Sequence, residues 1–302
     1  MVNSTVGEEL LARLSDGIAE LTSSDRWREY LTVQAKFPHY SPRNAMLILY
    51  QDPYATRVAS YKRWESMGRQ VRKGEHGLRI LAPMLHQEIN EDTGERQASI
   101  RGFRLVPVFD VAQTDGDPLP EITRLLAGDD AAGHFAQLSA VAESLGSRVE
   151  EAEFDDGRNG DFSPETKVIR VKASNPPRQR VKTLAHELGH AILHDDAGAL
   201  AELEAESVAF VVCQRLGVDT SDYSFGYVAS WAGDKAQELI FASAKRIQSA
   251  ADTIVDQLEA LNAPRPAADA VVNERAIADA IEKYYTPSSR HIDLAVVGGA
   301  EL

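Results

Sequence analysis

The feature that most constrains this chain is the five-residue pattern His186-Glu187-Leu188-Gly189-His190. Apolar residues recur around it with helical spacing, which predicts a packed helix. Four residues of a helix turn about 400°, so His186 and His190 lie on one face, one turn apart, and can share one metal ion. Glu187 then lies where it can reach a water at the metal instead of the metal itself. The pattern therefore predicts a helix that carries a metal site.

A carboxylate further along the chain is predicted to complete the ligand set. A catalytic zinc takes three protein ligands, and two histidines with one glutamate are a recurring set. Glu202 is the predicted third ligand, and Glu206, four residues later, is the predicted hydrogen-bond partner of a ligand imidazole. A solvated helix face is the alternative interpretation of these glutamates. His194 is a competing ligand, but it lies two turns and roughly 80° from His186, so we interpret it as structural or as a partner of a ligand.

Composition narrows the possible chemistry further. The chain has 302 residues, a formal net charge of −14 and a single cysteine, Cys213. One cysteine excludes an internal disulfide and any cysteine-rich zinc or iron–sulfur site, so a metal is expected to be held by His, Asp or Glu. No apolar run approaches the roughly 18 residues of a membrane helix, and residues 1–22 lack the apolar core of a signal peptide. We therefore expect a cytoplasmic globular protein of one or two domains.

The first 112 residues are predicted to form a small α+β unit. Apolar residues at helical spacing predict a helix over residues 7–21. Ser41 and Pro42 fit the start of a short helix that stops before Pro53. After Trp64 the pattern changes to strands, which are predicted over residues 70–72, 78–82, 85–89 and 100–109.

A second, helix-rich unit with a small sheet is predicted after a linker at residues 113–120, which is rich in turn formers. Its helices are expected over residues 134–145, 178–194, 199–216 and 235–261, with a short element at 227–231. Strands are expected over residues 148–154 and 166–171, separated by a turn at 157–160. The predicted domains are residues 1–126 and 127–262, followed by a linker and tail at 263–302.

Residues 57–81 form a basic segment, because their seven arginines and lysines outnumber their two glutamates, although the chain as a whole is acidic. Residues 105–302, by contrast, carry a net charge of −16. Cations that follow phosphates, with aromatic rings such as Tyr61 interleaved to stack on bases, are typical of single-stranded DNA binding. The predicted DNA-binding residues are Arg43, Asn44, Lys62, Arg63, Trp64, Arg69, Arg72 and Lys73.

These residues also have structural interpretations, which the sequence leaves open. Trp64 is equally well explained as a core residue, and Arg43 and Asn44 can cap or pin the start of a helix. A solvated surface of strands and turns is often locally basic. If DNA binds, phosphates and stacked base faces carry little sequence information, so we expect binding without base specificity.

Taken together, the motifs resemble a known family along most of the chain. The histidine pattern followed by residues 202–210 resembles the ImmA/IrrE-type zinc peptidase domain of ArdC-type antirestriction proteins. Residues 40–44, 64–75 and 108–114 are similar to the amino-terminal single-stranded DNA-binding domain of that family. The resemblance covers about residues 6–262, with Pro42 as a mild departure. It implies a DNA-binding module joined to a zincin fold, found on plasmids, phages and integrated elements.

We therefore expect an antirestriction-type protein that binds single-stranded DNA and carries a Zn²⁺ peptidase site, protecting or processing incoming mobile-element DNA. Zinc would be held by His186, His190 and Glu202, with Glu187 moving the proton of the attacking water. Tyr223 and Tyr227 are candidates for stabilising the oxyanion. The alternatives are a non-catalytic DNA-coating protein with a structural zinc site, and a peptidase that cleaves a regulatory protein.

Overall fold

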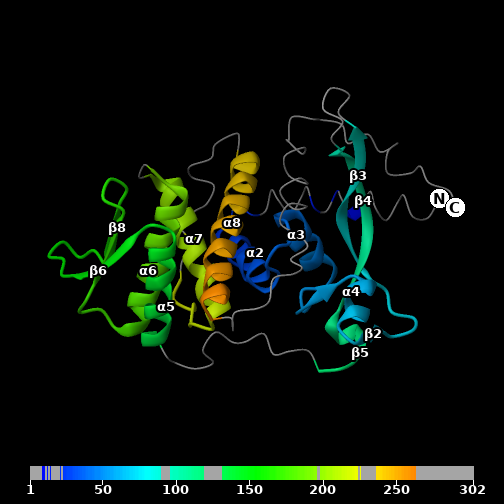
Figure 1. Ribbon diagram of the computed structural model, residues 1–302, viewed down its shortest axis with the longest axis horizontal. Coiled ribbons are helices and arrows are strands. Elements are labelled where there is room, and N and C mark those ends of the chain that lie inside the picture. The colour runs from blue at the N-terminus through cyan, green and yellow to red at the C-terminus, as the bar shows by residue number, and fades with distance from the viewer. Residues whose placement is uncertain are drawn as a thin grey trace. The chain divides into compact units, whose positions relative to one another are not determined.

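The computed structural model describes residues 23–89, 96–118, 131–195, 198–223 and 236–262, together with residues 9, 10, 12, 14, 21 and 225. The chain folds into two compact units, whose elements are labelled in Figure 1. The first unit is built on His39–Pro118, and the second on Ile18–Pro38 and Leu119–Ala268. Because each unit combines helices with small sheets, the predicted α+β class is confirmed.

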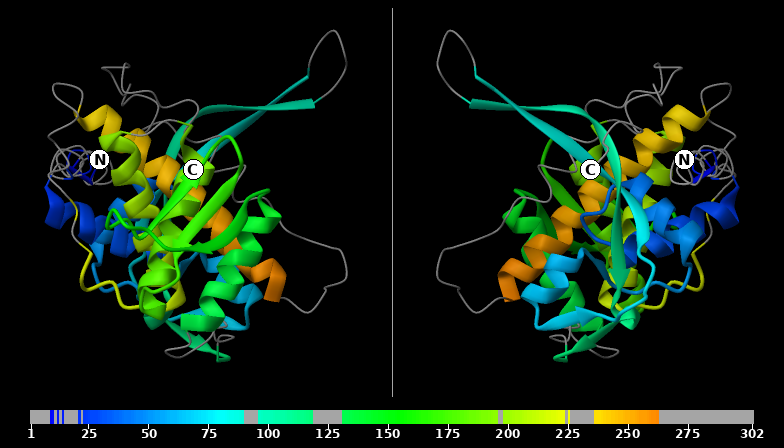
Figure 2. Two further views of the ribbon diagram at one scale, coloured as in Figure 1. Left: turned by 90° about the vertical axis from the view of Figure 1, so that its left-hand side faces the viewer. Right: turned by 90° about the vertical axis from the view of Figure 1, so that its right-hand side faces the viewer.

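A long antiparallel ribbon dominates the first unit. β3 (Leu78–Ile89) pairs with β4 (Arg96–Asp110), and β1 (Val58–Ala59) pairs with the other edge of β4. Figure 2 shows β3 and β4 as two long, twisted strands. Their register shifts between Met84 and Leu85, where the sequence pattern predicted a break. The two strands predicted on either side of this break are therefore one strand with a bulge.

A smaller ladder joins two segments that lie far apart in the sequence. β2 (Arg69–Val71) pairs with β5 (Thr114–Gly116), which follows β4 through the 3-10 turn η1 (Val111–Gln113). β5 occupies part of the predicted linker at residues 113–120, and the two compact units divide after Pro118, within the same segment. Turn-forming composition describes only local preference, whereas the strand character of β5 comes from pairing with β2.

Two short helices complete the described part of the first unit, α3 (Pro42–Gln51) and α4 (Tyr61–Ser66). The Ser41 side chain accepts a hydrogen bond from the backbone of Asn44, so the predicted start of α3 is confirmed. The sequence pattern did not predict α4, although Ser60 caps it in the same way. Its six residues are too few to display a helical period.

Two amide side chains fasten α3 to the edge of β3. Asn44 accepts a hydrogen bond from the N–H of Leu81 at 2.8 Å and donates one to the carbonyl of Leu81 at 3.0 Å. Gln51, two turns later, makes the same pair of bonds with the backbone of Arg79 at 2.8 and 2.9 Å. An edge strand exposes unpaired N–H and C=O groups, and these amides satisfy them in place of a neighbouring strand.

Five helices and a three-stranded sheet make up the described part of the second unit. The helices are α2 (Ser24–Lys36), α5 (Ala131–Ser144), α6 (Pro177–Leu193), α7 (Ala199–Leu216) and α8 (Ala236–Asn262). The strands are β6 (Arg148–Ala152), β7 (Gly160–Ser163) and β8 (Val168–Lys172). In the order β6-β8-β7, β8 is parallel to β6 and antiparallel to β7.

The central helix of the second unit is α7, which lies between α6 and α8 (Figure 1). Residues on all of its sides are buried, among them Val208, Phe210, Val211 and Cys213. A helix that is apolar all round is stable only when neighbours cover every face. None of the described helices nevertheless has the length and apolar character needed to cross a membrane.

The helix α2 was not predicted, and it packs in the second unit. Trp27 is fully buried and donates a hydrogen bond to the Ser207 hydroxyl of α7 at 2.9 Å, across 180 residues of sequence. Arg28 donates to the carbonyl of Thr220 at 2.7 Å. The boundary between residues 1–126 and 127–262 stays a prediction, but these contacts place α2 with the later part of the chain.

Several predicted segments fall outside the described residues. They are most of the helix at 7–21, the short element at 227–231 and the tail at 263–302. Three leucines of the first segment are described, and Leu10, Leu14 and Leu21 are buried as its apolar spacing predicts.

Candidate metal centre and nucleic-acid surface

The metal-site motif lies on α6, which α7 approaches closely. A Cβ atom on Gly189 would lie 3.0 Å from the Cα of Ala205 and 3.3 Å from the Cβ of Val208. A larger side chain at either small residue would force the helices apart, because packed interiors leave no spare volume. The close approach brings the first turn of α7, which carries Glu202, alongside the two histidines.

Three side chains aim donor atoms at one point. The Nε2 atoms of His186 and His190 lie 3.1 Å apart. The carboxylate oxygens of Glu202 lie 3.4 Å from the first Nε2 and 3.5 Å from the second. A tetrahedral zinc with bonds of about 2.0–2.1 Å separates its ligands by roughly 3.3–3.4 Å. The three donors therefore have the spacing of one face of such a site.

The second ring nitrogen of each histidine is also engaged. Nδ1 of His186 lies 3.1 Å from Oε2 of Glu206, the contact that the predicted role of Glu206 requires. Nδ1 of His190 lies 3.2 Å from Nδ1 of His194. A hydrogen bond at Nδ1 fixes the ring and leaves Nε2 available to a metal.

Glu187 is buried beside this cluster and only 6% exposed. Burial raises the pKa of Glu187 to about 7, with Asp161 and Glu202 acting in the same direction and His186 and Arg158 opposing them. A carboxyl group with a pKa near neutrality can both accept and release a proton.

The strand β7, which was missed by the sequence pattern, borders Glu187. A Cβ atom on Gly160 would lie 3.2 Å from Oε1 of Glu187 and 2.5 Å from Cγ2 of Thr183 on α6. The absence of a side chain at this position lets the strand lie against α6. A turn was predicted at residues 157–160, and the last of these already belongs to β7. Because β7 pairs only with β8 among the described strands, it is an edge strand.

The two histidines differ in their electrostatic surroundings. Burial lowers the pKa of His186, but the hydrogen bond to Glu206 and the charges of nearby glutamates more than offset it, so this pKa lies above its ordinary value. Burial, followed by the positive charges of His186 and His194, lowers the pKa of His190 to about 4. Neutral imidazole is the form that binds a metal.

Tyr223, one of the two tyrosines considered for the oxyanion, is a core residue. It is 6% exposed, its hydroxyl donates to Sγ of Cys213 at 3.6 Å, and burial raises its pKa. Tyr227 lies outside the described residues.

Three of the predicted DNA-binding residues are buried, as their structural interpretations require. Trp64 is 2% exposed and donates from Nε1 to the carbonyl of Phe109 at 2.8 Å, so it cannot stack on a base without leaving the core. Asn44 is committed to the backbone of Leu81. Arg43 is buried in the first turn of α3. The structural interpretations of these residues are the ones that fit.

A fourth predicted residue, Arg69, joins β2 to β5. Its guanidinium donates to the hydroxyl and carbonyl of Thr114 at 2.8 and 2.9 Å and to the carbonyl of Asp117 at 2.5 Å. With these donors engaged, Arg69 stabilises the ladder and has little left to offer a phosphate.

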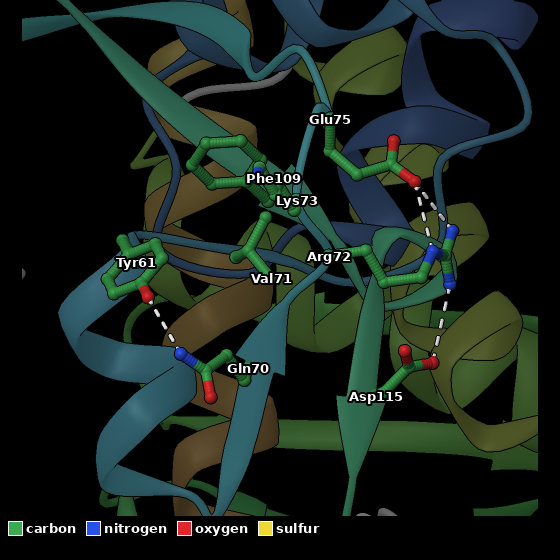
Figure 3. A pocket seen from close by; sticks show the side chains of 8 residues that line it. All are labelled: Tyr61, Gln70, Val71, Arg72, Lys73, Glu75, Phe109 and Asp115. Carbon is green, nitrogen blue, oxygen red and sulfur yellow. Dashed lines mark hydrogen bonds and ion pairs between the residues drawn. The ribbon is translucent and has the colours of Figure 1, made fainter.

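The other four predicted residues, Lys62, Arg63, Arg72 and Lys73, are exposed. Arg72 is held by Glu75 at 2.7 Å and faces Asp115 at 3.6 Å. Arg72 and Lys73 border a hollow of about 610 Å³, which is also lined by Tyr61, Gln70, Val71, Glu75, Phe109 and Asp115 (Figure 3). Figure 3 shows the Tyr61 hydroxyl on Gln70 at one side and the Arg72 cluster at the other. Tyr61 is 44% exposed, so this ring is available where Trp64 is not.

Two family models match the chain. The model described as the N-terminal domain of the anti-restriction factor ArdC matches residues 2–109. The Peptidase_M78 model, described as an IrrE N-terminal-like domain, matches residues 142–211, which include the histidine motif and Glu202. The second match gives the helix-rich unit a metallopeptidase-like domain.

Individual relatives are more distant. The chain is 25% identical over 264 residues to the uncharacterized protein pXO2-81 of Bacillus anthracis. The match covers 72% of this chain and 45% of that protein. The chain is 26% identical over 229 residues to the uncharacterized protein y4eC of Sinorhizobium fredii, covering 66% of this chain and 71% of the relative. The chain thus spans less than half the length of the Bacillus protein.

Two solved structures are also similar. The antirestriction protein ArdC from plasmid R388, in a metal-free form, is 22% identical with a TM-score of 0.45, covering 73% of this chain and 86% of that one. Its Mn(II)-bound form is 23% identical with the same TM-score, covering 77% and 98%. The two family models, in this order along one chain, give the protein an ArdC N-terminal domain followed by an IrrE-like domain, the arrangement that the resemblance to ArdC-type proteins predicted.

Proposed function

We propose that this ArdC-type protein holds a zinc ion at His186, His190 and Glu202, hydrolyses peptide bonds there, and binds single-stranded DNA through its first unit. In this proposal it protects or processes the incoming DNA of a mobile element. The observation that carries the proposal is the convergence of three donor atoms, from two helices, at separations of 3.1 to 3.5 Å. If these histidines and this glutamate only stabilised the fold, their donor atoms would not need to converge on one point.

The donor set fits a zinc site that keeps a position open for a substrate. It offers three ligands, two imidazoles and one carboxylate, and Glu202 is 61% exposed, so the site opens to solvent. A bound zinc would lower the pKa of a water towards neutrality and polarise the scissile carbonyl. Carboxylate and imidazole also accept manganese, so metal content is the first quantity to measure.

The chain's own residues supply proton transfer and orientation. Glu187 accepts the proton of the attacking water and delivers it to the leaving amine, a role that its burial beside the histidines supports. Glu206 holds His186 through Nδ1. The strand β7 borders Glu187, and because it pairs only with β8 among the described strands, its outer edge can align an extended peptide.

Metal content tests the first half of the proposal. Purified full-length protein is dialysed and its zinc and manganese are measured by mass spectrometry, with about one zinc per chain expected. Glu202→Ala should lose this zinc. Stoichiometric zinc in Glu202→Ala would instead show that another residue completes the ligand set.

The exposed cations and the aromatic hollow support the DNA-binding half. Lys62, Arg63 and Lys73 are exposed, and the Tyr61 ring lies beside Gln70 at the hollow near Lys73 (Figure 3). A base stacked on Tyr61 would place its phosphates near these cations, the arrangement that single-strand binding requires. Tyr61 thus takes the role first predicted for Trp64.

Anisotropy of a fluorescent single-stranded oligonucleotide of mixed sequence tests this surface in the full chain. Binding should weaken as salt rises. Tyr61→Ala should weaken binding by about 1–3 kcal/mol, since that is the range for one stacked base. Tyr54→Ala is a matched control, because Tyr54 is 87% exposed but does not line the hollow. Equal losses in both variants would remove the hollow from the interface.

The same experiments decide between the proposal and its alternatives. Zinc without hydrolysis, together with intact DNA binding, would favour a DNA-coating protein with a structural metal. Hydrolysis without DNA binding would favour a peptidase that acts on a regulatory protein.

A further inference from the structure

A network of polar side chains leads away from His190 through the interior of the second unit. Nδ1 of His190 lies 3.2 Å from Nδ1 of His194, and Nε2 of His194 lies 2.9 Å from Oε2 of Glu204. The other carboxylate oxygen of Glu204 accepts from Nε of Arg246 on α8 at 3.0 Å. This network of side chains therefore connects α6, α7 and α8.

Glu204 is an unusual residue for its position. It is fully buried, on a central helix whose neighbouring positions are apolar, and the metal-site chemistry does not use it directly. Its carboxylate pairs with the guanidinium of Arg246, so it acts as a hydrogen-bond acceptor. A buried charge of this kind needs partners on both oxygens, which His194 and Arg246 provide.

The hydrogen-bonding capacity of each group determines which group donates and which accepts along the network. Both oxygens of Glu204 act as acceptors, because one of its partners is the Arg246 guanidinium, so Nε2 of His194 donates. With its proton on Nε2, His194 offers Nδ1 as an acceptor, and the contact with His190 then places the proton of His190 on Nδ1. Nε2 of His190 is thereby left with its lone pair, and it is this atom that faces His186 and Glu202.

His186 is oriented by direct contact with a carboxylate, without an intervening imidazole. Its Nδ1 contacts Glu206 directly, and that carboxylate is 36% exposed. At the equivalent place His190 contacts the imidazole of His194, and the carboxylate of Glu204 lies beyond that imidazole, in the core. The two ligand histidines therefore depend on different supports.

On this basis, and resting on the proposed metal site, we infer that Glu204 and Arg246 are positioning residues that act through His194 to hold His190 in its metal-binding tautomer. His194 is then a required intermediate, and its place eight residues after His186 follows from this role.

The first test measures zinc affinity by chelator competition in the full chain. Glu204→Gln should weaken zinc binding about 10- to 100-fold, the range for loss of a group that orients a ligand. Arg246→Met should cause a smaller loss, and because Arg246 is 47% exposed this variant is expected to fold. Asp252→Asn is the matched control, since it removes another buried carboxylate that pairs with an arginine, Arg215, at 2.7 Å. It should leave zinc affinity within twofold.

The second test needs no metal. Nitrogen-15 NMR of the metal-free protein reports which nitrogen of His190 carries the proton, and wild type should show the proton on Nδ1. Glu204→Gln should give a mixture of tautomers, whereas Asp252→Asn should match wild type. A purely structural role for Glu204 would change stability without changing this signal.

The two readouts separate this inference from the metal proposal. If wild type binds no zinc, the proposed site fails, and the tautomer of His190 in Glu204→Gln still decides the role of Glu204. If wild type binds zinc while Glu204→Gln keeps both its affinity and its His190 tautomer, the inference is overturned.

Discussion

The two units differ in how their functional residues relate to the sequence. In the second unit, the three predicted ligands come from two successive helices, and the structure brings all three together. In the first unit, four of the eight predicted DNA-binding residues, Arg43, Asn44, Trp64 and Arg69, have structural roles. Helical spacing fixes which side chains share a face, so a motif on a helix already contains most of its geometry. A surface built from turns and short strands depends on partners elsewhere in the chain.

The strongest test of this contrast is the removal of a ligand. We expect His190→Ala to lose the zinc that wild type retains at about one per chain after dialysis, because a single remaining imidazole and a flexible carboxylate hold zinc weakly. Metal analysis provides the measurement, and His76→Ala, an exposed histidine of the first unit, should keep its zinc. Full zinc content in His190→Ala would mean that the helical motif is not the site.

The next test separates metal binding from proton transfer. Glu187→Gln should keep zinc but lose about 100-fold or more of any hydrolysis of fluorescent denatured casein, since an amide cannot accept the proton of water. Zinc content of the same preparation is the control. An unchanged rate of hydrolysis would exclude Glu187 from the mechanism.

In the first unit, paired aromatic variants sharpen the distinction between core and surface. Trp64→Ala should lower the free energy of unfolding by about 3–5 kcal/mol, because it leaves a cavity and removes the hydrogen bond to the Phe109 carbonyl. Tyr61→Ala should change it by about 0.5 kcal/mol or less, since this ring is exposed. Urea denaturation followed by circular dichroism compares the two. A stable Trp64→Ala with weakened DNA binding would restore the stacking role of Trp64.

The smallest expected effect concerns the exposed cations. Replacing Lys62, Arg63 and Lys73 together by Ala should lower the salt dependence of single-strand binding by about two, at roughly 0.7 per lost phosphate contact. Arg26 and Arg148 are exposed arginines of the second unit, and their double Ala variant should keep the wild-type slope. Binding constants at several salt concentrations provide the measurement. An unchanged slope in the triple variant would move the phosphate contacts elsewhere.

The sequence by itself determined those parts of the protein that depend on local periodicity and capping. Helical spacing placed the histidines and Glu187 on α6, and Ser41 with Pro42 marked the start of α3. Alternation of apolar residues predicted the main strands β3, β4 and β8. The same reasoning left open whether Trp64 faces a base or the core, because burial of one side chain depends on residues far away in the chain.

Only the tertiary structure decided which polar side chains are partners. Glu204 has the same sequence signature as its exposed neighbour Glu202, yet it is buried because α8 brings Arg246 to it. Likewise, α2 belongs with α7 through Trp27 and Ser207, which lie 180 residues apart. Such contacts depend on how whole helices pack, and no local pattern encodes that packing. The motif therefore specified the ligands from sequence, while the residues that orient them emerged only from the fold.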